Sequence, residues 1–336
     1  MSVNELSIDL GSNYTTIYKK NSGVVLCEPT LALLQTYGKN MKVLKMGLEA
    51  ERLYGKSSDD EIFVKPVVEG VIKNIDLTQK ILSYFFSKVV RYKLIKPAVK
   101  LIVCLPVGLS ESEYEDYKKV FYAVGFERID FVYNLVCCSL VDAPYFSLGK
   151  TSLIVNIGAG KTEIASIVGG KMLKSCSINV GGNMVDKGIV ENLQKMKGYI
   201  VSQNLACKIK QEIGSLYETD KSDMEVLVQD AVVNSQISTI ISAKDIMKPV
   251  YETYFKILQT VQAFYNECSS EVAEDIKNDG IVLCGGASQI TGLEKFFKKI
   301  LNLSVFVIDN AEVCSVLGTE KLFSDLTLLQ KIVEEN

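Results

Sequence analysis

The sequence predicts an α/β protein built from two related halves. The chain has 336 residues, of which 48% are apolar, and this is more than one domain of common size needs. The segment SIDLGSNYTTIY at 7–18 has the same pattern of apolar, polar and glycine residues as IVNIGAGKTEIA at 154–165, 147 positions later. Each copy reads as an apolar strand, a turn with glycine and a second strand, which is the pattern of a hairpin. Between and after the copies, apolar runs alternate with segments of helical periodicity, as in α/β folds.

Other strands and helices are marked by apolar runs and by caps. Strands are predicted in KLIVCLPVG at 100–108 and in GIVLCGG at 280–286, which both end in glycine. Ser110 and Glu113 have the spacing of a capping box, so a helix should begin there and stop at Gly125. Further helices are predicted from about Pro249 through Phe264, at roughly 293–301 and in the tail 318–336.

The alternation of predicted strands and helices along the chain indicates where the domains begin and end. The first domain should cover 1–143 and the second 144–314. Two stretches interrupt the rhythm, at about 32–70 and at about 181–245, and each is expected to form a smaller subdomain inserted into its half. Residues 315–336 are expected to return to the first domain as a helical segment.

Composition excludes several classes of function. The chain has no histidine, which excludes Ser-His-Asp and Cys-His catalysis and imidazole metal ligands. Its nine cysteines are scattered without a CxxC motif, as expected in a reducing cytosol rather than in a disulfide framework. The net charge of −3, without a basic block, predicts no nucleic-acid partner. Without a signal sequence or an apolar run of ~18 residues, we expect a cytoplasmic protein.

The glycine turns at equivalent places in the two halves predict phosphate binding. Glycine lets a backbone approach closely and present N–H groups to phosphate oxygens. The turns Gly11-Ser12-Asn13 and Gly158-Ala159-Gly160 are therefore expected to grip a triphosphate from two sides, with a third turn at Gly285–Ser288 under the base and ribose. The GAGKT run at 158–162 is no P-loop, because Val155 stands where that motif needs its first glycine.

Blocks in a characteristic order make the chain resemble the MreB group of the actin superfamily. The blocks lie at 8–33, 64–86, 101–113, 156–167, 206–215 and 280–297. The resemblance covers essentially the whole chain. It implies an actin-like fold of two domains and four subdomains around a nucleotide cleft. It also implies ATP as ligand, with Mg²⁺, and head-to-tail filaments that serve cell shape or internal scaffolding.

The resemblance also assigns nucleotide-binding residues by motif position. In the first loop they are Gly11, Ser12, Asn13 and Tyr14, and in the second loop Gly158, Ala159, Gly160 and Lys161. Cys207, in place of a usual acid, and Lys210 should lie at the ribose or base. The adenine side should be formed by Gly285, Gly286, Ala287, Ser288 and Gln289.

Departures from the family pattern predict weak or lost hydrolysis. Asn134 and Leu135 stand where the family has a pair of glutamates, and leucine cannot orient a water. Asn156 replaces the acid that begins the second phosphate motif, and Lys161 replaces a threonine. Asp9 remains as an indirect partner for the metal. Two readings of Lys161 stay open: it replaces part of the divalent cation, or the cleft is decaying and the lysine points to solvent.

The remaining expectations concern surfaces and partners. Leu94 and Ile95, flanked by cations, match the hydrophobic loop of MreB proteins and suit anionic lipids, but they read equally well as a strand lead-in buried in the core. The expected partners are copies of the chain itself and, as a hypothesis, a hydrolysing MreB paralogue. Two alternatives stay open: a non-polymerising pseudo-ATPase adaptor of the same fold, and a small-molecule kinase, for which the chain lacks a convincing catalytic aspartate.

Overall fold

A computed structural model describes residues 4–38, 40–54, 58, 60–90, 98–126, 128–141, 151–217, 223–232 and 235–335. The chain forms two compact units. The first consists of Met1–Pro144, Ile167–Cys176 and Val313–Asn336, and the second of Tyr145–Ser166 and Ser177–Glu312. The first unit therefore contains both chain ends and the tip of a hairpin from the middle of the sequence.

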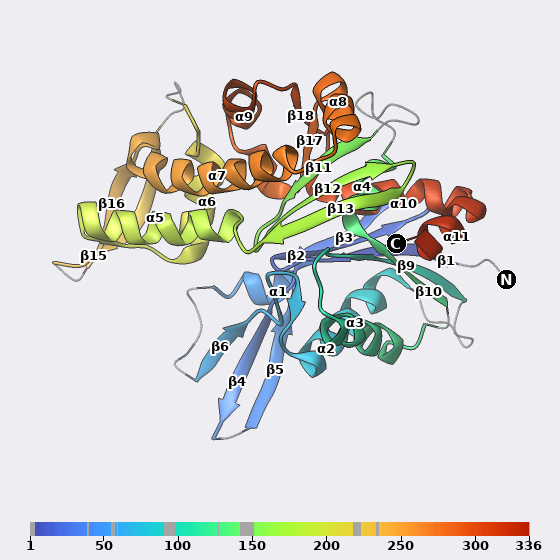
Figure 1. Cartoon of the computed structure of the whole chain (residues 1–336). Coiled ribbons are helices and arrows are strands. Elements are labelled where there is room, and N and C mark those ends of the chain that lie inside the picture. The colour runs from blue at the N-terminus through green and yellow to red at the C-terminus, as the bar shows by residue number, and fades with distance from the viewer. Residues whose placement is uncertain are drawn as a thin grey trace. The chain divides into compact units, whose positions relative to one another are not determined.

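The first unit is built on a five-stranded mixed sheet (Figure 1). Its order is β10 (Arg128–Tyr133), β9 (Val99–Leu105), β1 (Asn4–Leu10), β2 (Tyr14–Lys19) and β3 (Gly23–Pro29). Strands β10, β9 and β1 run parallel, whereas β1, β2 and β3 form an antiparallel meander. The helices are α2 (Ile75–Val89), α3 (Glu111–Ala123), α4 (Asn134–Ser139), α10 (Cys314–Ser324) and α11 (Leu326–Glu335).

Alternation along β1 divides the two faces of this sheet. Leu6 and Ile8 are fully buried and join the core that α2 and α3 complete with Phe85, Phe86 and Tyr117. The intervening residues point to α10 on the other face: Ser7 hydrogen-bonds Thr319 at 2.7 Å, and Ser315 donates to Asp9. One strand thus supplies apolar core to one face and a polar row to the other.

A smaller sheet follows β3. Its strands are β5 (Asn40–Met46), β4 (Ala32–Tyr37) and β6 (Glu61–Val64) in that order, with the short helix α1 (Leu48–Glu51) beside them. A two-stranded hairpin of β7 (Val67–Val68) and β8 (Val71–Ile72) leads back to α2. These elements occupy the part of the chain in which the sequence pattern predicted an inserted subdomain.

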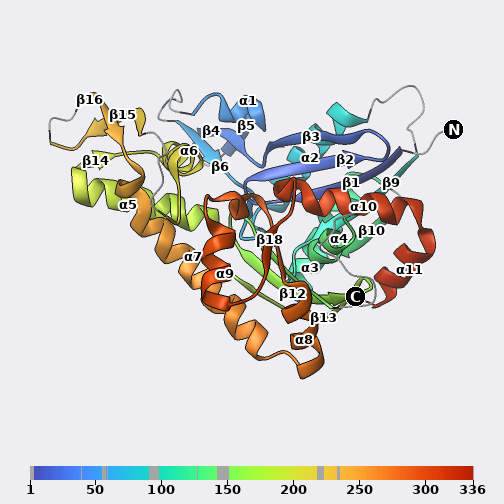
Figure 2. The same cartoon turned by 90° about the horizontal axis from the view of Figure 1, so that it is seen from above.

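The second unit repeats the plan. Its sheet has the order β13 (Lys171–Ile178), β12 (Thr162–Val168), β11 (Ser152–Ile157), β17 (Ile281–Cys284) and β18 (Val305–Val307). The end of β12 and most of β13 belong to the segment Ile167–Cys176, which is grouped with the first unit. The helices are α5 (Gly182–Lys197), α6 (Gln203–Ile213), α7 (Ala243–Asn266), α8 (Ser270–Asp279) and α9 (Leu293–Leu301), with single turns at Gly286–Gln289 and Ala311–Val313. A three-stranded sheet of β14 (Tyr199–Ile200), β15 (Met224–Asp230) and β16 (Gln236–Ile241) lies between α5 and α7 in the chain; Figure 2 gives a second view.

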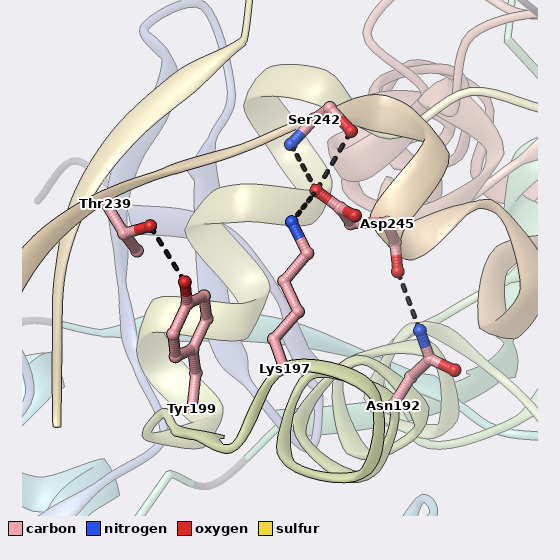
Figure 3. Close-up of polar contacts among 6 residues, drawn as sticks. All are labelled: Asn192, Lys197, Tyr199, Thr239, Ser242 and Asp245. Atoms are coloured by element: carbon pink, nitrogen blue, oxygen red, sulfur yellow. Dashed lines mark hydrogen bonds and ion pairs between the residues drawn. The ribbon is translucent and has the colours of Figure 1, made fainter. Parts of the chain in front are cut away.

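Helix α7 begins earlier than the sequence pattern predicted. The expected start at Pro249 is wrong, because a capping box of Ser242 and Asp245 begins the helix at Ala243. Proline lacks an N–H group and leaves the carbonyl four residues earlier without its helical donor. That carbonyl belongs to Asp245, and the side-chain amide of Asn192 on α5 donates to it at 2.7 Å (Figure 3). The other predicted capping box, Ser110 with Glu113 on α3, is confirmed.

An ion pair also links α5 to α7 at this place, which we call the corner between α5 and α7. Lys197, at the end of α5, places its ammonium 2.8 Å from the carboxylate of Asp245, which also accepts from the backbone N–H of Ser242 (Figure 3). In the small sheet, Thr239 on β16 donates to Tyr199 on β14 at 3.2 Å (Figure 3). These contacts connect the small sheet to the end of α5 and the start of α7.

None of the described helices has the length and apolar character to cross a membrane.

Candidate functional site

The predicted first phosphate loop is the turn between β1 and β2. The N–H of Gly11 donates to the carbonyl of Tyr14 at 3.1 Å, and β1 pairs with β2 from that point, so the predicted hairpin is confirmed. A Cβ on Gly11 would lie 2.6 Å from the same carbonyl oxygen, closer than real Cβ contacts. Only glycine therefore closes this turn without a shift of the backbone.

Segment 65–70 holds the side chains of this loop. The N–H of Gly70 donates to the hydroxyl of Ser12 at 3.1 Å, and the ammonium of Lys65 donates to the side-chain oxygen of Asn13 at 2.7 Å. Ser12 is buried and Asn13 half-buried, whereas Tyr14 is largely exposed and donates to Glu51 at 3.4 Å. The sequence argument missed Lys65, because a lysine between two short strands has no pattern that distinguishes it from a surface charge.

The second loop, between β11 and β12, closes in the same way. The N–H of Gly158 donates to the carbonyl of Lys161 at 3.0 Å, the counterpart of the Gly11–Tyr14 bond 147 positions earlier. The loop then packs on the start of α5. The N–H groups of Gly182 and Asn183 donate to the carbonyls of Gly158 and Ala159, at 3.0 and 2.7 Å. Two amides that a helix start leaves without helical partners are thus satisfied by the loop itself.

Lys161 is only 8% exposed. The alternative in which this lysine points to solvent is therefore wrong. Lys161 ends the second glycine turn, and a buried ammonium is stable only where polar or negative groups compensate its charge.

The two hairpins differ in their acids. Asp9 on β1 accepts a hydrogen bond from Ser315, and burial raises the pKa of its carboxyl above the usual value, although the bond from Ser315 lowers it. On β11 the corresponding residue is Asn156, whose side-chain amide donates to the buried carboxylate of Glu163 at 3.0 Å. At these equivalent positions each hairpin therefore has one carboxylate, Asp9 in the first and Glu163 in the second.

Leu135 is the residue for which the family resemblance implies the loss of a water-positioning acid. It is fully buried in the first turn of α4, where the neighbouring Asn134 is 5% exposed. Helix α4 packs closely on α10, since a Cβ on Gly318 would lie 1.8 Å from the carbonyl oxygen of Cys137. An apolar side chain in this packed turn neither accepts nor donates a proton.

Most of the residues predicted to contact the ribose and base line one cavity within the second unit. It has a volume of about 270 Å³, and its lining includes Lys210, Tyr254, Gly286, Ala287 and Gln289. The Lys210 ammonium lies 2.7 Å from the carboxylate of Asp186 and 3.0 Å from the carbonyl of Gly182. The hydroxyl of Tyr254 donates to the carbonyl of Ala287. Helices α5, α6 and α7 and the 286–289 turn are thereby connected around the cavity.

Three of the predicted residues are placed elsewhere. Ser288 is buried and turns its hydroxyl back to the carbonyl of Gly285 at 2.7 Å. Cys207 is half-buried on α6 and is not part of the lining of this cavity. Gly285 has φ of +86° and supports the turn, since a Cβ there would meet the Asn156 side chain at 2.3 Å. Leu94 and Ile95 lie outside the described residues.

Comparison with known proteins gives the chain its family. The family described as MreB/Mbl protein matches residues 3–331. The cell shape-determining protein MreB of Haemophilus influenzae is 28% identical over 320 residues, which cover 94% of this chain and 91% of that protein. The cell shape-determining protein Mbl of Bacillus subtilis is 24% identical over 334 residues, which cover 98% and 99%.

Solved structures match over the same length. The crystal structure of Spiroplasma citri MreB5 bound to ADP has a TM-score of 0.89 and 27% identity, and covers 98% of both chains. The same protein bound to AMPPNP has the same TM-score and identity, with 100% coverage of both. A double helical filament of MamK matches with a TM-score of 0.77 at 16% identity, which concerns the fold alone. The predicted actin-like fold is confirmed, and the chain belongs to the MreB/Mbl family of bacterial actin-like cytoskeletal proteins.

Proposed function

We propose that this chain binds adenine nucleotide and assembles with copies of itself into filaments, with little or no hydrolysis of the nucleotide. The observation that carries the binding proposal is the identical closure of two glycine turns, by Gly11–Tyr14 and by Gly158–Lys161. Such turns suit phosphate, and a cavity beside Lys210 and Gly286 suits a ribose and base. A protein of the same fold, at 27% identity, has been crystallised with ADP and with AMPPNP.

The residues present also fit a divalent cation, with fewer acids than the family pattern has. Mg²⁺ would neutralise phosphate charge, and Asp9 is the carboxylate that the family resemblance leaves to hold its waters. Lys161 would supply part of the same neutralisation as a fixed charge. We therefore expect ATP binding that depends less on Mg²⁺ than an all-carboxylate site would.

Weak hydrolysis follows from Leu135. A general base or a water-positioning group contributes about 10²–10⁴ to a rate, and the packed leucine supplies neither. Phosphate release from ATP by the purified chain, measured at saturating Mg-ATP, tests this point. A rate lower than that of an active MreB by about 10²-fold or more is expected, and equal rates would contradict it.

Assembly follows from the family, and its use in the cell is proposed with it. Relatives named for cell-shape determination support a role in shape or internal scaffolding. A filament without efficient hydrolysis would serve as a stable partner of a hydrolysing paralogue. Co-sedimentation of the two proteins tests that partnership, and failure to co-assemble at every ratio would contradict it. Membrane contact through Leu94 and Ile95 remains a prediction, to be tested by binding to anionic vesicles.

A further inference from the structure

Asp186 and Lys210 form a buried ion pair beside the cavity of the second unit. Asp186 is on α5 and Lys210 is on α6, and their side chains are 2% and 11% exposed. The ammonium lies 2.7 Å from the carboxylate and donates to the carbonyl of Gly182 at 3.0 Å. Because Gly182 and Asp186 are four positions apart on one helix, both groups lie on the same face of α5.

Glycine at position 182 allows this approach. A Cβ there would lie 3.1 Å from the Lys210 ammonium, which is tighter than most real Cβ contacts. The N–H of Gly182 donates to the carbonyl of Gly158 at 3.0 Å, so the second glycine turn holds this residue as well. Groups of the protein itself therefore fix the position of the ammonium.

Lys210 gives the cavity wall its formal charge. Among the described residues that line this cavity, every other side chain is an amide, a hydroxyl or apolar. Burial raises the pKa of the Tyr254 hydroxyl, and the negative charge of Asp186 raises it further, so this group stays neutral and donates to the carbonyl of Ala287. Asp186 is not part of the lining and acts on the cavity from behind it.

The charge of the pair decides what the cavity can hold. A buried ammonium without a negative partner attracts an anion, because too little water is present to solvate its charge. With a carboxylate 2.7 Å away, the positive charge of Lys210 is compensated. The wall then offers hydrogen bonds and apolar contacts without a net charge.

We propose that Asp186 is a specificity-determining residue, which makes this cavity take the uncharged nucleoside part of the nucleotide and exclude phosphate. This rests on the proposed function of the second unit. Asp186 acts through Lys210 and does not touch the ligand. The anionic end of the nucleotide is thereby left to the glycine turn at 158–160.

The test is competition between inorganic phosphate and adenosine, measured by displacement of a fluorescent adenosine analogue, with chloride of equal ionic strength as the reference. In the unmodified chain, phosphate should change the affinity for adenosine by less than about twofold. D186N keeps the size of the side chain and removes its charge. Phosphate should then weaken adenosine binding by about tenfold or more, the usual worth of a hydrogen bond to a charged group. Competition of equal size in the unmodified chain and in D186N would overturn the inference.

Two further variants show whether the effect passes through Lys210. D186N combined with K210M removes both charges, so phosphate should no longer compete with adenosine. E191Q removes one negative charge from an exposed position of the same helix and should behave as the unmodified chain does. Competition that persists in the double variant, or that appears in E191Q, would contradict a role of Asp186 through Lys210.

The unmodified chain decides the question if D186N does not fold. Adenosine 2′-monophosphate and adenosine 3′-monophosphate should bind no more tightly than adenosine, because an added phosphate finds no uncompensated positive charge in the wall. Tighter binding of either would overturn the inference. If the chain binds neither Mg-ATP nor adenosine, the proposed function itself fails. Binding of Mg-ATP without binding of adenosine would leave the proposed function standing and overturn the inference alone.

Discussion

The side-chain amide of Asn156 donates a hydrogen bond to the buried carboxylate of Glu163, over 3.0 Å. Their counterparts 147 positions earlier are Asp9 and Thr16, which stand opposite each other on β1 and β2. An aspartate at 156 would place two acids side by side. The asparagine therefore fits the glutamate beside it, and each hairpin keeps one carboxylate and one neutral partner.

The first prediction concerns this pair. Asn156→Asp should lower the Tm of the nucleotide-free protein by a few degrees, because two adjacent carboxylates repel by roughly 1–2 kcal/mol. Mg²⁺ should recover most of the loss, since a cation between two acids removes the repulsion. Thermal melting with and without Mg²⁺ measures both effects. The control combines Asn156→Asp with Glu163→Gln, which restores one acid and one amide. An equally low Tm in that control would refute repulsion as the cause.

The second prediction concerns Asp9. Burial raises the pKa of Asp9, so the folded chain binds this proton more tightly than the unfolded chain does. Ionised Asp9 therefore costs stability at pH 7, and the cost disappears as the pH falls through the folded pKa. Asp9→Asn should raise the Tm at pH 7 by roughly 2–4 °C, with a smaller gain near pH 4.

The same variant should weaken the Mg²⁺-dependent part of ATP binding, because the asparagine has no charge for the hydrated metal. A lower Tm at pH 7 in the absence of nucleotide would contradict the sign given above. Unchanged dependence of ATP affinity on Mg²⁺ would contradict a metal role for Asp9.

The third prediction concerns Lys161. If its buried ammonium neutralises phosphate charge, Lys161→Ala should weaken ATP binding by about tenfold or more in EDTA, and by less in Mg²⁺, where the cation compensates. Titration of a fluorescent ATP analogue under both conditions provides the measurement. The matched control is Lys171→Ala, an exposed lysine at the start of β13. Equal loss in EDTA and in Mg²⁺ would exclude the substitution of the cation by Lys161.

The fourth prediction concerns the corner between α5 and α7 (Figure 3). Asp245→Ala removes the bond to Lys197 and the capping bonds to Ser242, and should cost about 1–2 kcal/mol. Lys197→Met removes the ion pair alone and should cost less than about 1 kcal/mol. Denaturant unfolding gives both values. Equal costs would mean that the cap contributes nothing.

The pH dependence of that corner has the opposite sign to that of Asp9. Burial raises the pKa of Asp245, but the bonds from Lys197 and Ser242 outweigh it and leave the pKa below the usual value. The stabilisation is therefore complete above the unfolded pKa of ~4 and is lost as the pH falls through the folded pKa. The difference in stability between the unmodified chain and Asp245→Ala should shrink in acid.

The fold was predictable where local pattern and tertiary structure agree. The turns at Gly11 and Gly158 need glycine for close backbone approach, and that need is visible in the sequence. The start of α7 was misplaced because proline favours a first turn, whereas here Asn192, 57 positions from Pro249, takes the carbonyl that the proline leaves. A distant donor of this kind leaves no local pattern.

For the candidate site, the sequence indicates the glycine turns but not the hydrogen bonds and ion pairs that orient the side chains. The glycine turns and Lys210 follow from motif position, but the partners that orient them do not. Lys65 and Asn13 are 52 positions apart, and Asp186 and Lys210 are on different helices. Glu163 was visible beside the second turn, but its bond to Asn156 depends on strand pairing, which composition and spacing do not specify.

The most direct test of nucleotide-dependent assembly is sedimentation of the purified chain with and without Mg-ATP, in the absence of lipid. We predict that the chain pellets with Mg-ATP and stays in the supernatant without it, and that the pelleted nucleotide is still mostly ATP. A pellet of equal size without nucleotide would contradict a working nucleotide site. No pellet under either condition would contradict assembly and favour an adaptor of the same fold.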